Sequence, residues 1–407
     1  MIARLNVGGP AKQALFLTQR LNDTFFQSTL ITGVVSDDEA EMTFPYPDLE
    51  RHVHVLPTLG REISWLQDIR TFVELCKMLK AIQPDIVHTH TAKAGTLGRL
   101  AAMWVRVPIT VHTFHGHVFR EYFAPFKTWL FVCIEKLLSH ATDRIVVLSE
   151  SQRRELSDEF QVASPQKLHV IPLGFNLSPF LSESGPAEVR TELGIGPSAF
   201  VLGFVGRLVP IKNPFLLLEA YCLATQSQQT TRATSEASSE AWHVIIAGGG
   251  ELRDSLASTV QAKQLSHRIH FCGWQQRVAH IYAAMNVVVL TSCNEGTPVA
   301  LIEAMASGKP FIATTVGGVI DLMVGAGQTM YSDNGGVFTL YQNGILVKSQ
   351  DAVGLAGALR YVRNHPKEST VMGRVGREFA VKSFDEQRLL GDMRQLYQDL
   401  LAEKGMH

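Results

Sequence analysis

Short β-branched segments alternate with helical stretches along almost the whole chain. Strands that are separated by helices usually pair in parallel, so this alternation predicts doubly wound α/β sheets with helices on both faces. We expect two series of strands, of about six each. The first series covers residues 30–35, 53–56, 85–89, 109–114, 144–148 and 168–171, and the second covers 200–205, 244–247, 268–272, 286–290, 310–314 and 345–347.

Two series of strands indicate two domains, since a chain of 407 residues is longer than one ordinary core supports. The break follows residues 171–174, where a polar stretch with glycine, proline and serine begins. We therefore expect a first domain at residues 1–173 and a second at 174–383. The remaining segment, 384–407, is predicted to form a long amphipathic helix. Its apolar positions on one side are Leu389, Leu390, Met393, Leu396 and Leu400.

Two segments depart from this regular pattern. Residues 225–240 are rich in Gln, Thr and Ser, which predicts a flexible surface insertion in the second domain. At the other end, Ile2–Leu5 reaches the Gly8-Gly9-Pro10 turn almost at once. A doubly wound domain normally begins with a full strand, so the first strand is expected to be short.

The charge balance excludes one class of partner and leaves another open. A net charge of −1 gives no reason to expect a nucleic-acid partner. Between His88 and Ser149, however, seven basic residues stand against three acidic ones. This local excess suits an anionic surface such as phospholipid or a lipid phosphate. It suits a solvated helix face equally well.

The cysteines and the hydropathy pattern predict a cytoplasmic protein. The five cysteines are scattered and lack CxxC spacing, so we expect reduced, packed thiols. The sequence shows no secretory signal and no apolar run long enough to cross a bilayer. Any contact with the membrane is therefore expected to be peripheral.

Two acidic residues, Glu295 and Glu303, carry the most information about a binding site. Glu295 lies in the loop after the strand that ends near Thr291. Glu303 lies in the middle of a short helix, 299–306, that is apolar on nearly every side. A buried carboxylate is costly without a donor, so Glu303 either has a buried partner or faces a polar ligand. A core ion pair with an arginine is the plainer alternative.

The residues around this helix favour a ligand-binding role for Glu303 over a core ion pair. Thr297 is a good N-cap, Pro298 suits the first helical position, and Gly308 is a natural stop. A strand, an acid in the loop and a helix N-terminus together predict a site for a hydroxyl-rich, anionic ligand.

Two basic residues follow the first strand of the second domain. That strand ends at Gly206, so Arg207 and Lys212 are expected at the carboxyl edge of the sheet, where α/β proteins bind ligands. Two fixed cations can neutralise a leaving pyrophosphate in place of a metal ion. Solvated surface residues are the alternative for this pair taken alone.

Two glycine clusters give weaker signals. Gly248-Gly249-Gly250 follows a strand and would allow close backbone approach. Gly8 and Gly9 form a turn into a helix whose N–H groups are suited to a phosphate. The turn lacks GxGxxG spacing, which counts against a nicotinamide oxidoreductase.

Histidines gather at two strand ends of the first domain, in 88–90 and 112–117. Residues two apart in a strand share a face, so a zinc cluster is one alternative. No cysteine or carboxylate lies nearby in sequence to complete such a site. The better hypothesis is a neutral histidine that forms hydrogen bonds in an interdomain cleft.

Taken together, these residues resemble the family 4 glycosyltransferases, and the resemblance covers almost the whole chain. Its most specific element is the family's E-x7-E motif, which matches Glu295 and Glu303. Gly206, Arg207 and Lys212 match the diphosphate clamp. Gly8 and Gly9 match the N-terminal glycine loop. The stretches 89–95 and 115–119 look like the subgroup of bacterial capsule, exopolysaccharide and O-antigen synthesis. The family's Glu-Gly-Phe-Gly is Glu-Gly-Thr-Pro in this sequence, which leaves the sugar preference open.

The resemblance implies the GT-B fold: two Rossmann-like domains facing across a cleft, with the C-terminal helix packing back on the first domain. It implies an acceptor site in the first domain and a nucleotide-sugar site in the second. His115 is assigned the place beside the donor sugar, with His117 as its competitor. Glu303 is assigned the ribose. Glu295 is assigned the sugar, together with the backbone of Gly296, Thr297, Pro298 and Val299.

The resemblance also implies a retaining, metal-independent transfer from a nucleotide-diphosphate sugar. UDP is the nucleotide that we expect. The acceptor is expected to be a saccharide. The basic excess and the likeness to the subgroup suggest a lipid-linked one, on the cytoplasmic face of the membrane. Two alternatives remain: a GT-B nucleotide-sugar 2-epimerase and a non-catalytic nucleotide-sugar-binding subunit. The sequence leaves open the sugar, the acceptor, the linkage and the oligomeric state.

Overall fold

The computed structural model describes residues 1–5, 9–35, 51–60, 64–115, 125–182, 186–229 and 241–406. The chain divides into two compact units. Unit 1 comprises Met1–Gly174 and Glu386–His407, and unit 2 comprises Phe175–Asp385. The domain limits expected from the sequence, 173/174 and 383/384, fall beside these divisions. The roles expected for the two domains remain predictions.

Unit 1 is built on a parallel sheet. Strands β3 to β6 pair in sequence order, and β1 pairs with β2. The first residues lie between these two groups, because Ile2 bridges to Thr32 and the His90 amide donates to the Met1 carbonyl at 2.8 Å. Where a short first strand was expected, the described residues form an isolated bridge at Ile2. The strands are β1 (Leu30–Thr32), β2 (Val53–Val55), β3 (Ile86–His90), β4 (Ile109–Thr113), β5 (Arg144–Val147) and β6 (Leu168–Val170).

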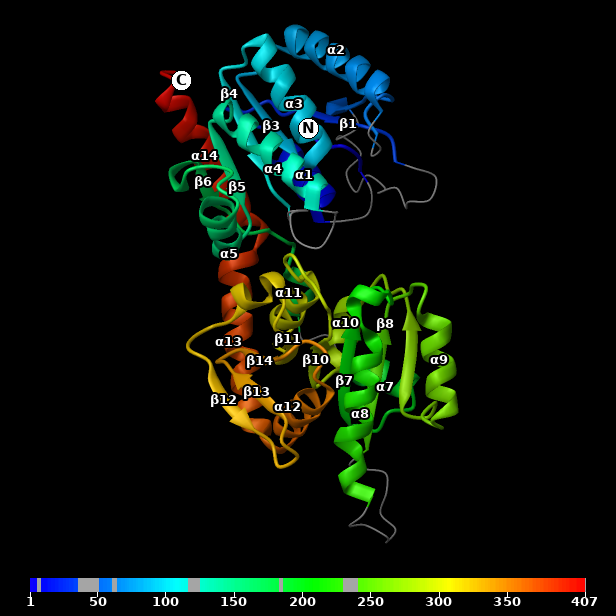
Figure 1. Cartoon of the computed structure of the whole chain (residues 1–407). Coiled ribbons are helices and arrows are strands. Elements are labelled where there is room, and N and C mark those ends of the chain that lie inside the picture. The colour runs from blue at the N-terminus through cyan, green and yellow to red at the C-terminus, as the bar shows by residue number, and fades with distance from the viewer. Residues whose placement is uncertain are drawn as a thin grey trace. The chain divides into compact units, whose positions relative to one another are not determined.

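The helices of unit 1 cover both faces of its sheet (Figure 1). The last helix returns to this unit from the far end of the sequence. Its apolar side, Leu389 to Leu400, packs with Ile109, Val111 and Val146 in one buried cluster, so the expected return of the C-terminal helix is confirmed. The helices are α1 (Gly9–Arg20), α2 (Trp65–Ile82), α3 (Ala92–Val105), α4 (Pro125–His140), α5 (Glu150–Arg154) and α14 (Glu386–Glu403).

Unit 2 contains an eight-stranded sheet in the order β12-β13-β14-β11-β10-β7-β8-β9. The six strands from β14 to β9 are parallel, and β12 and β13 add an antiparallel edge. The strands are β7 (Phe200–Val205), β8 (Trp242–Ala247), β9 (Ile269–Gly273), β10 (Val287–Leu290), β11 (Phe311–Thr314), β12 (Gln328–Tyr331), β13 (Val337–Leu340) and β14 (Gly344–Val347).

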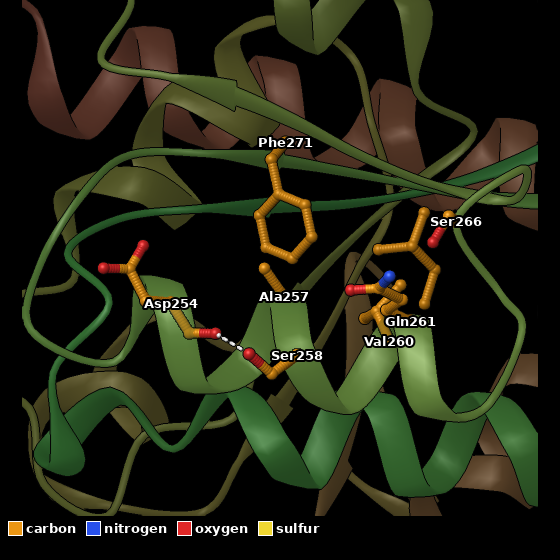
Figure 2. Close-up of a pocket in the computed structure, with 8 residues that line it drawn as sticks. Asp254, Ala257, Ser258, Val260, Gln261, Ser266 and Phe271 are labelled. Atoms are coloured by element: carbon orange, nitrogen blue, oxygen red, sulfur yellow. Dashed lines mark hydrogen bonds between the residues drawn. The ribbon is translucent and has the colours of Figure 1, made fainter.

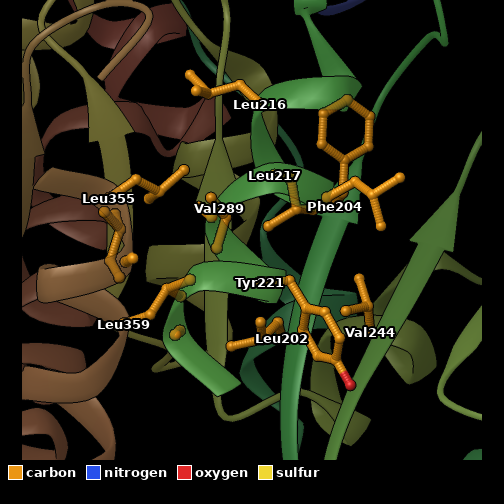
Figure 3. Packing of buried hydrophobic residues seen from close by; sticks show 14 of the residues in the cluster. Leu202, Phe204, Leu216, Leu217, Tyr221, Val244, Val289, Leu355 and Leu359 are labelled. Carbon is orange, nitrogen blue, oxygen red and sulfur yellow. The ribbon is translucent and has the colours of Figure 1, made fainter. Parts of the chain in front are cut away.

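The core of unit 2 lies in two layers, one on each face of this sheet. Strand residues point alternately to the two faces, so Leu202 and Phe204 join one layer while Val201 joins the other. Figure 3 shows the first layer, in which Leu355 and Leu359 pack beside Leu202 and Val289. The helices are α6 (Ser178–Leu181), α7 (Pro186–Glu192), α8 (Pro214–Gln229), α9 (Arg253–Ala262), α10 (Val278–Ala284), α11 (Val299–Ala306), α12 (Ala352–Asn364) and α13 (Pro366–Phe384).

The expected α/β fold class is confirmed, and one expectation about a segment is corrected. Helix α8 continues to Gln229, so the predicted flexible insertion was wrong for residues 225–229. The apolar side of α8 packs on the sheet, and this packing stabilises a helix that continues into the polar sequence. The rest of that prediction, 230–240, lies outside the described residues.

Candidate active site

The acids and cations singled out in unit 2 lie at one edge of its sheet. Strands β7 and β10 are parallel neighbours, so the loops that follow them emerge at the same edge. Two contacts tie these loops together. The Thr291 hydroxyl donates to the Lys212 carbonyl at 2.9 Å, and the Cys293 amide donates to the Ile211 carbonyl at 2.7 Å.

Glu295 and Lys212 form an ion pair at this edge, with 2.5 Å between Oε1 and Nζ. The hydroxyl of Ser292 donates to the same Oε1 atom at 2.6 Å. The Glu295 side chain is only 8% exposed and that of Lys212 is 21% exposed, so the pair is partly withdrawn from water. A charge-assisted contact of this kind fixes the carboxylate in one orientation.

The loop after β11 supports Glu295 from the other side. The Gly318 amide donates to the Glu295 carbonyl at 3.1 Å. Gly317 has φ +46°, and a Cβ there would lie 1.8 Å from that same carbonyl oxygen. Glycine is therefore required for the close approach of the two loops.

The N-terminus of α11 follows directly from this loop. The helix spans Val299–Ala306, and Gly308 follows it with φ +68°, as its role as a stop requires. The predicted cap was wrong: Pro298 is the N-cap residue, and no side chain caps the helix. The Leu301 amide donates to the Pro298 carbonyl at 3.0 Å, so the N–H groups of Val299 and Ala300 are the ones suited to an anion.

Glu303 is held by Tyr282 of α10. The Tyr282 hydroxyl lies 2.9 Å from Glu303 Oε2 and 3.0 Å from the Ala300 carbonyl. Burial, and secondarily the carboxylate, raise the pKa of Tyr282 well above its usual value of 10, so it stays a neutral donor. Tyr282 is thus one buried donor to Glu303, as the sequence led us to expect.

Arg207 is exposed and follows β7 by two residues. Gly206, between them, contacts the glycine cluster after β8. A Cβ on Gly248, which has φ +137°, would lie 1.9 Å from the Gly206 carbonyl oxygen. The Leu208 amide also donates to the Gly249 carbonyl at 2.8 Å. The cluster therefore allows the approach of a neighbouring loop, and this contact positions Arg207.

Ser292 and Tyr282 are the two residues of this site that sequence reasoning missed. Ser292 lies three residues before Glu295, and its type and spacing are a usable signal for a donor to that acid. Tyr282 precedes Glu303 by a whole strand and loop, so no short-range pattern links them.

The histidines of unit 1 form a chain of contacts beside the carboxyl ends of β3 and β4. His90 Nδ1 lies 2.8 Å from His115 Nε2, and the His88 and His90 rings stack with centroids 4.3 Å apart. His88 in turn contacts Thr113 at 2.7 Å and Tyr397 of α14 at 2.5 Å. Strand alternation thus places His88 and His90 on one face, as expected.

These histidines are neutral at physiological pH. Burial lowers the pKa of His115 to about 4 and lowers the pKa values of His88, His90 and His112 well below 6.5. The Nδ1 atom of His115 is buried and makes no hydrogen bond to any described residue. Such an atom is suited to a ligand hydroxyl.

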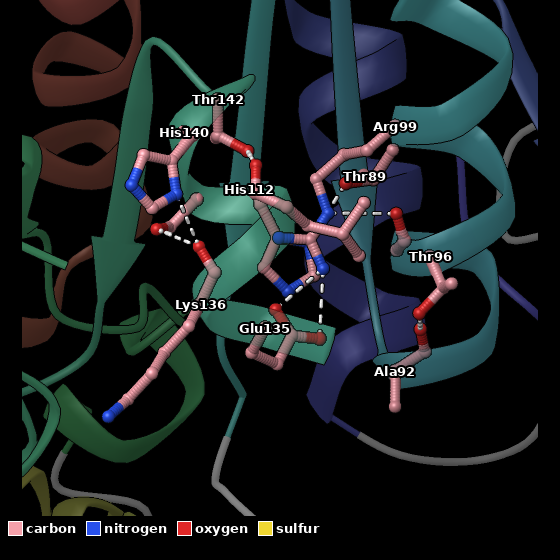
Figure 4. Close-up of polar contacts among 12 residues, drawn as sticks. Thr89, Ala92, Thr96, Arg99, His112, Glu135, Lys136, His140 and Thr142 are labelled. Carbon is pink, nitrogen blue, oxygen red and sulfur yellow. Dashed lines mark hydrogen bonds and ion pairs between the residues drawn. The ribbon is translucent and has the colours of Figure 1, made fainter. Parts of the chain in front are cut away.

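His112 faces away from this chain and belongs to a structural contact between α3 and α4. Figure 4 shows Arg99 of α3 reaching Glu135 of α4, with 2.7 and 2.9 Å to the two carboxylate oxygens. Thr89 lies 2.9 Å from His112 Nδ1. Arg99 and Glu135 are both buried, so this ion pair fixes how α4 docks.

Some predictions fall outside the described residues, namely Gly8 and His117. Gly9 is the first residue of α1. In the described parts of the chain, no three His, Cys, Asp or Glu side chains are grouped so that they could hold a metal ion. The zinc alternative therefore gains no support from the described histidines.

An open pocket between α9 and β9 lies apart from these residues (Figure 2). Its only charged lining residue is Asp254, which repels rather than binds a diphosphate. The lining residues are Asp254, Ala257, Ser258, Val260, Gln261, Ser266, Ile269 and Phe271. We therefore do not assign the ligand to this pocket.

Two family models match the chain in succession. Residues 8–174 match a glycosyl transferase 4-like domain, and residues 187–379 match the glycosyl transferases group 1. The chain belongs to the family 4 glycosyltransferases. Its family membership confirms the resemblance that rested on the E-x7-E motif and the clamp residues.

Known proteins agree with this family. The glycosyltransferase is 29% identical over 361 residues to an Escherichia coli UDP-Gal:alpha-D-GlcNAc-diphosphoundecaprenol alpha-1,3-galactosyltransferase, covering 88% of this chain and 87% of that protein. It is 24% identical over 354 residues to the capsular polysaccharide biosynthesis glycosyltransferase CapM of Staphylococcus aureus, covering 86% of each. These names do not favour the epimerase or the non-catalytic subunit.

A solved structure shows the fold of the glycosyltransferase. Anabaena Alr3699/HepE in complex with UDP superposes with a TM-score of 0.75 at 19% identity, covering 98% of each chain. This likeness confirms the GT-B fold. Within the described residues, no helix is long and apolar enough to span a membrane.

Proposed function

We propose that this glycosyltransferase moves a sugar from a UDP-sugar to a saccharide linked to a polyprenyl diphosphate, in the synthesis of a surface polysaccharide. The Escherichia coli relative, named for a UDP-Gal donor and a diphosphoundecaprenol acceptor, supports both substrate classes. The observation that carries the proposal is the Lys212–Glu295 pair with Ser292, which sets a cation and an oriented acid together at the carboxyl edge of the unit 2 sheet.

The donor is held by charge and by hydrogen bonds. Arg207, Lys212 and the open N–H groups of α11 bind the diphosphate. Glu303, oriented by Tyr282, accepts hydrogen bonds from the ribose hydroxyls. Glu295 and the backbone of 296–299 bind the sugar, and His115 offers its unused Nδ1 atom to a sugar hydroxyl.

Transfer follows from the charges that develop. As the bond between the anomeric carbon and the phosphate oxygen breaks, negative charge grows on the diphosphate and positive charge on the sugar ring. Lys212 and Arg207 stabilise the first without a metal ion. The acceptor hydroxyl attacks from the face that the phosphate leaves, and its proton passes to the departing phosphate oxygen. The anomeric configuration is retained.

The test uses UDP-galactose, UDP-glucose and UDP-N-acetylglucosamine with a polyprenyl-diphosphate-linked saccharide, with and without EDTA. We expect a new glycoside of retained configuration by NMR, formed at the same rate in EDTA. A C2 epimer, or donor that is bound and recovered unchanged, would refute the transfer. Loss of the product in EDTA alone would refute the metal-free step.

Variants test the residue roles. Lys212→Ala, Glu295→Ala and His115→Ala are each expected to abolish transfer while leaving the circular dichroism spectrum unchanged. Lys263→Ala, which removes an exposed lysine of the same unit, is the matched control. Near-normal turnover in one of the three would exclude the role assigned to that residue.

A further inference from the structure

The outward side of α4 in unit 1 is apolar and exposed. Phe126, Trp129, Leu130 and Leu137 recur at helical spacing and form one stripe, with exposed fractions of 72, 60, 43 and 73%. The Phe126 and Trp129 rings stack with centroids 6.1 Å apart. Helices of globular proteins normally turn such a stripe inward, so an exposed one indicates an interaction surface.

Helix α2 carries a second exposed stripe. Trp65, Leu66, Ile69 and Val73 lie on its outward side. Helix α3 packs against α2 on one side and α4 on the other, and Figure 1 shows α3 between these two helices. Right-handed crossovers place helices that connect successive parallel strands on one face of a sheet. We call these three helices, α2 to α4, the helix layer.

The charges of the helix layer are unbalanced toward the positive. Each of its three acidic residues is paired within the layer: Asp68 with Lys93, Glu74 with Arg70, and Glu135 with Arg99. Four basic residues in the layer or at its helix ends make no ion pair to any described residue: Lys77, Lys80, Arg106 and Lys136. The free charge that the layer presents is therefore cationic.

We propose that the helix layer binds the surface of an anionic phospholipid bilayer. Exposed tryptophan and phenylalanine beside free lysine and arginine match the interfacial region of such a membrane, where aromatic rings sit at headgroup level and cations meet lipid phosphates. A second copy of this chain would bring the same cations together, so like charges disfavour it as the occupant.

The position of the layer connects it to the reaction, and this step rests on the proposed function. Helices α3 and α4 begin after the carboxyl ends of β3 and β4, where His90 and His115 lie. When the helix layer binds a bilayer, a polyprenyl-linked acceptor reaches this edge of the sheet while its polyprenyl chain stays in the lipid. The layer thus serves the acceptor side of the enzyme.

Vesicle flotation of the full chain tests the proposal. We expect binding to phosphatidylcholine vesicles that contain phosphatidylglycerol, and much weaker binding to phosphatidylcholine alone. Trp129→Ser combined with Leu137→Ser should lower the partition coefficient about tenfold, because two apolar anchors are lost. Tyr331→Ser is the matched control, since it removes an equally exposed ring (76%) from unit 2. Thermal melting verifies that each variant folds.

Charge is tested separately with Lys77→Glu combined with Lys136→Glu, against Lys382→Glu in unit 2. The Lys77→Glu/Lys136→Glu variant is expected to lose the preference for phosphatidylglycerol. The Lys382→Glu control is expected to keep it. Equal partitioning of the wild type and both double variants would overturn the proposal. So would a lipid-independent dimer in light scattering that disappears in Trp129→Ser/Leu137→Ser, because a second copy would then cover the layer.

The failure of this proposal can be told apart from that of the proposed function. Flotation needs no donor, and transfer can be measured with a short-chain, water-soluble acceptor. Vesicle binding without transfer would refute the function and leave the membrane surface standing. Transfer to the soluble acceptor without vesicle binding would refute the membrane surface and support the proposed function.

Discussion

Two neutral hydroxyl groups set the direction of the two acids in unit 2. Ser292 donates to Glu295, and Tyr282 donates to Glu303. A neutral donor orients a carboxylate without cancelling its charge. Under the proposed function, in which Lys212 binds a phosphate, the Ser292 hydroxyl still holds Glu295.

Ser292→Ala tests the first contact. A hydrogen bond to a charged group is worth about 1.5–3 kcal/mol, so kcat/KM should fall roughly 10- to 100-fold. Steady-state kinetics with the UDP-sugar measure this. Ser255→Ala, which removes a surface hydroxyl bonded to the Leu252 carbonyl, is the control. An unchanged kcat/KM in Ser292→Ala would show that Lys212 alone orients Glu295.

Tyr282→Phe tests the second contact and should have a different signature. If Glu303 binds the ribose equally in the ground and transition states, losing its orientation raises the donor KM about tenfold and leaves kcat nearly unchanged. The same kinetic assay separates the two constants. A fall in kcat at constant KM would place Glu303 in the chemical step instead.

The buried histidines predict how stability depends on pH. The folded pKa of His115 is about 4, against 6.5 for a free histidine, so the unfolded chain binds more protons between these values. The free energy of unfolding should therefore fall as pH drops from 6.5 toward 4, by about 1.4 kcal/mol per pH unit for this residue. His88, His90 and His112 add in the same direction.

Urea unfolding of unit 1 at several pH values measures this slope. His115→Gln should reduce the pH dependence by about one proton. His140→Gln, which replaces an exposed histidine on α4, is the matched control. Identical slopes in His115→Gln and the wild type would show that His115 is not buried as a neutral ring.

Among elements, the docking of α4 on α3 depends on the buried Arg99–Glu135 pair. Removing one partner leaves the other charge buried and alone, so Arg99→Met should cost about 3–5 kcal/mol of unfolding free energy. Arg99→Met combined with Glu135→Leu should recover most of this loss, because both charges are then gone. Urea unfolding followed by tryptophan fluorescence measures both. A double variant no more stable than the single one would contradict this account.

The sequence predicted the elements that carry strong patterns. The parallel strands and α11 follow from β-branched runs, a helix-compatible proline and a glycine stop. The antiparallel pair β12 and β13 was not predicted, because three of the four residues in Gln328–Tyr331 are exposed and lack an apolar period. The bounds of α11, 299–306, were predicted correctly, but its N-cap was placed one residue early, since Thr297 and Pro298 are both plausible at a helix start.

The candidate site was predictable in part for the same physical reason. Loops after parallel strands share one edge, so the nearness of Glu295 to Lys212 follows from the strand order. The contacts of Tyr282 with Glu303 and of Tyr397 with His88 depend on how helices pack, and spacing along the chain does not encode this. The catalytic roles of these residues remain predictions.

At the scale of the whole molecule, unit 2 has a complete core of its own. Both layers of its core come from residues between 175 and 385. We expect a fragment of residues 175–385 to fold cooperatively, and UDP to raise its melting temperature by mass action. Lys212→Ala in the same fragment should remove most of the shift. A fragment that aggregates or melts without a transition would show that unit 2 depends on unit 1.

Unit 1, by contrast, is completed only by α14, which supplies Leu389, Met393 and Leu400 to the cluster on β4 and β5. During synthesis these residues are the last of the core to leave the ribosome. Unit 2 can therefore fold first. The residues of unit 1 that were synthesised earlier keep part of their apolar surface exposed until α14 is made. Nascent chains stalled before α14 should resist protease in their middle and be cut near their beginning.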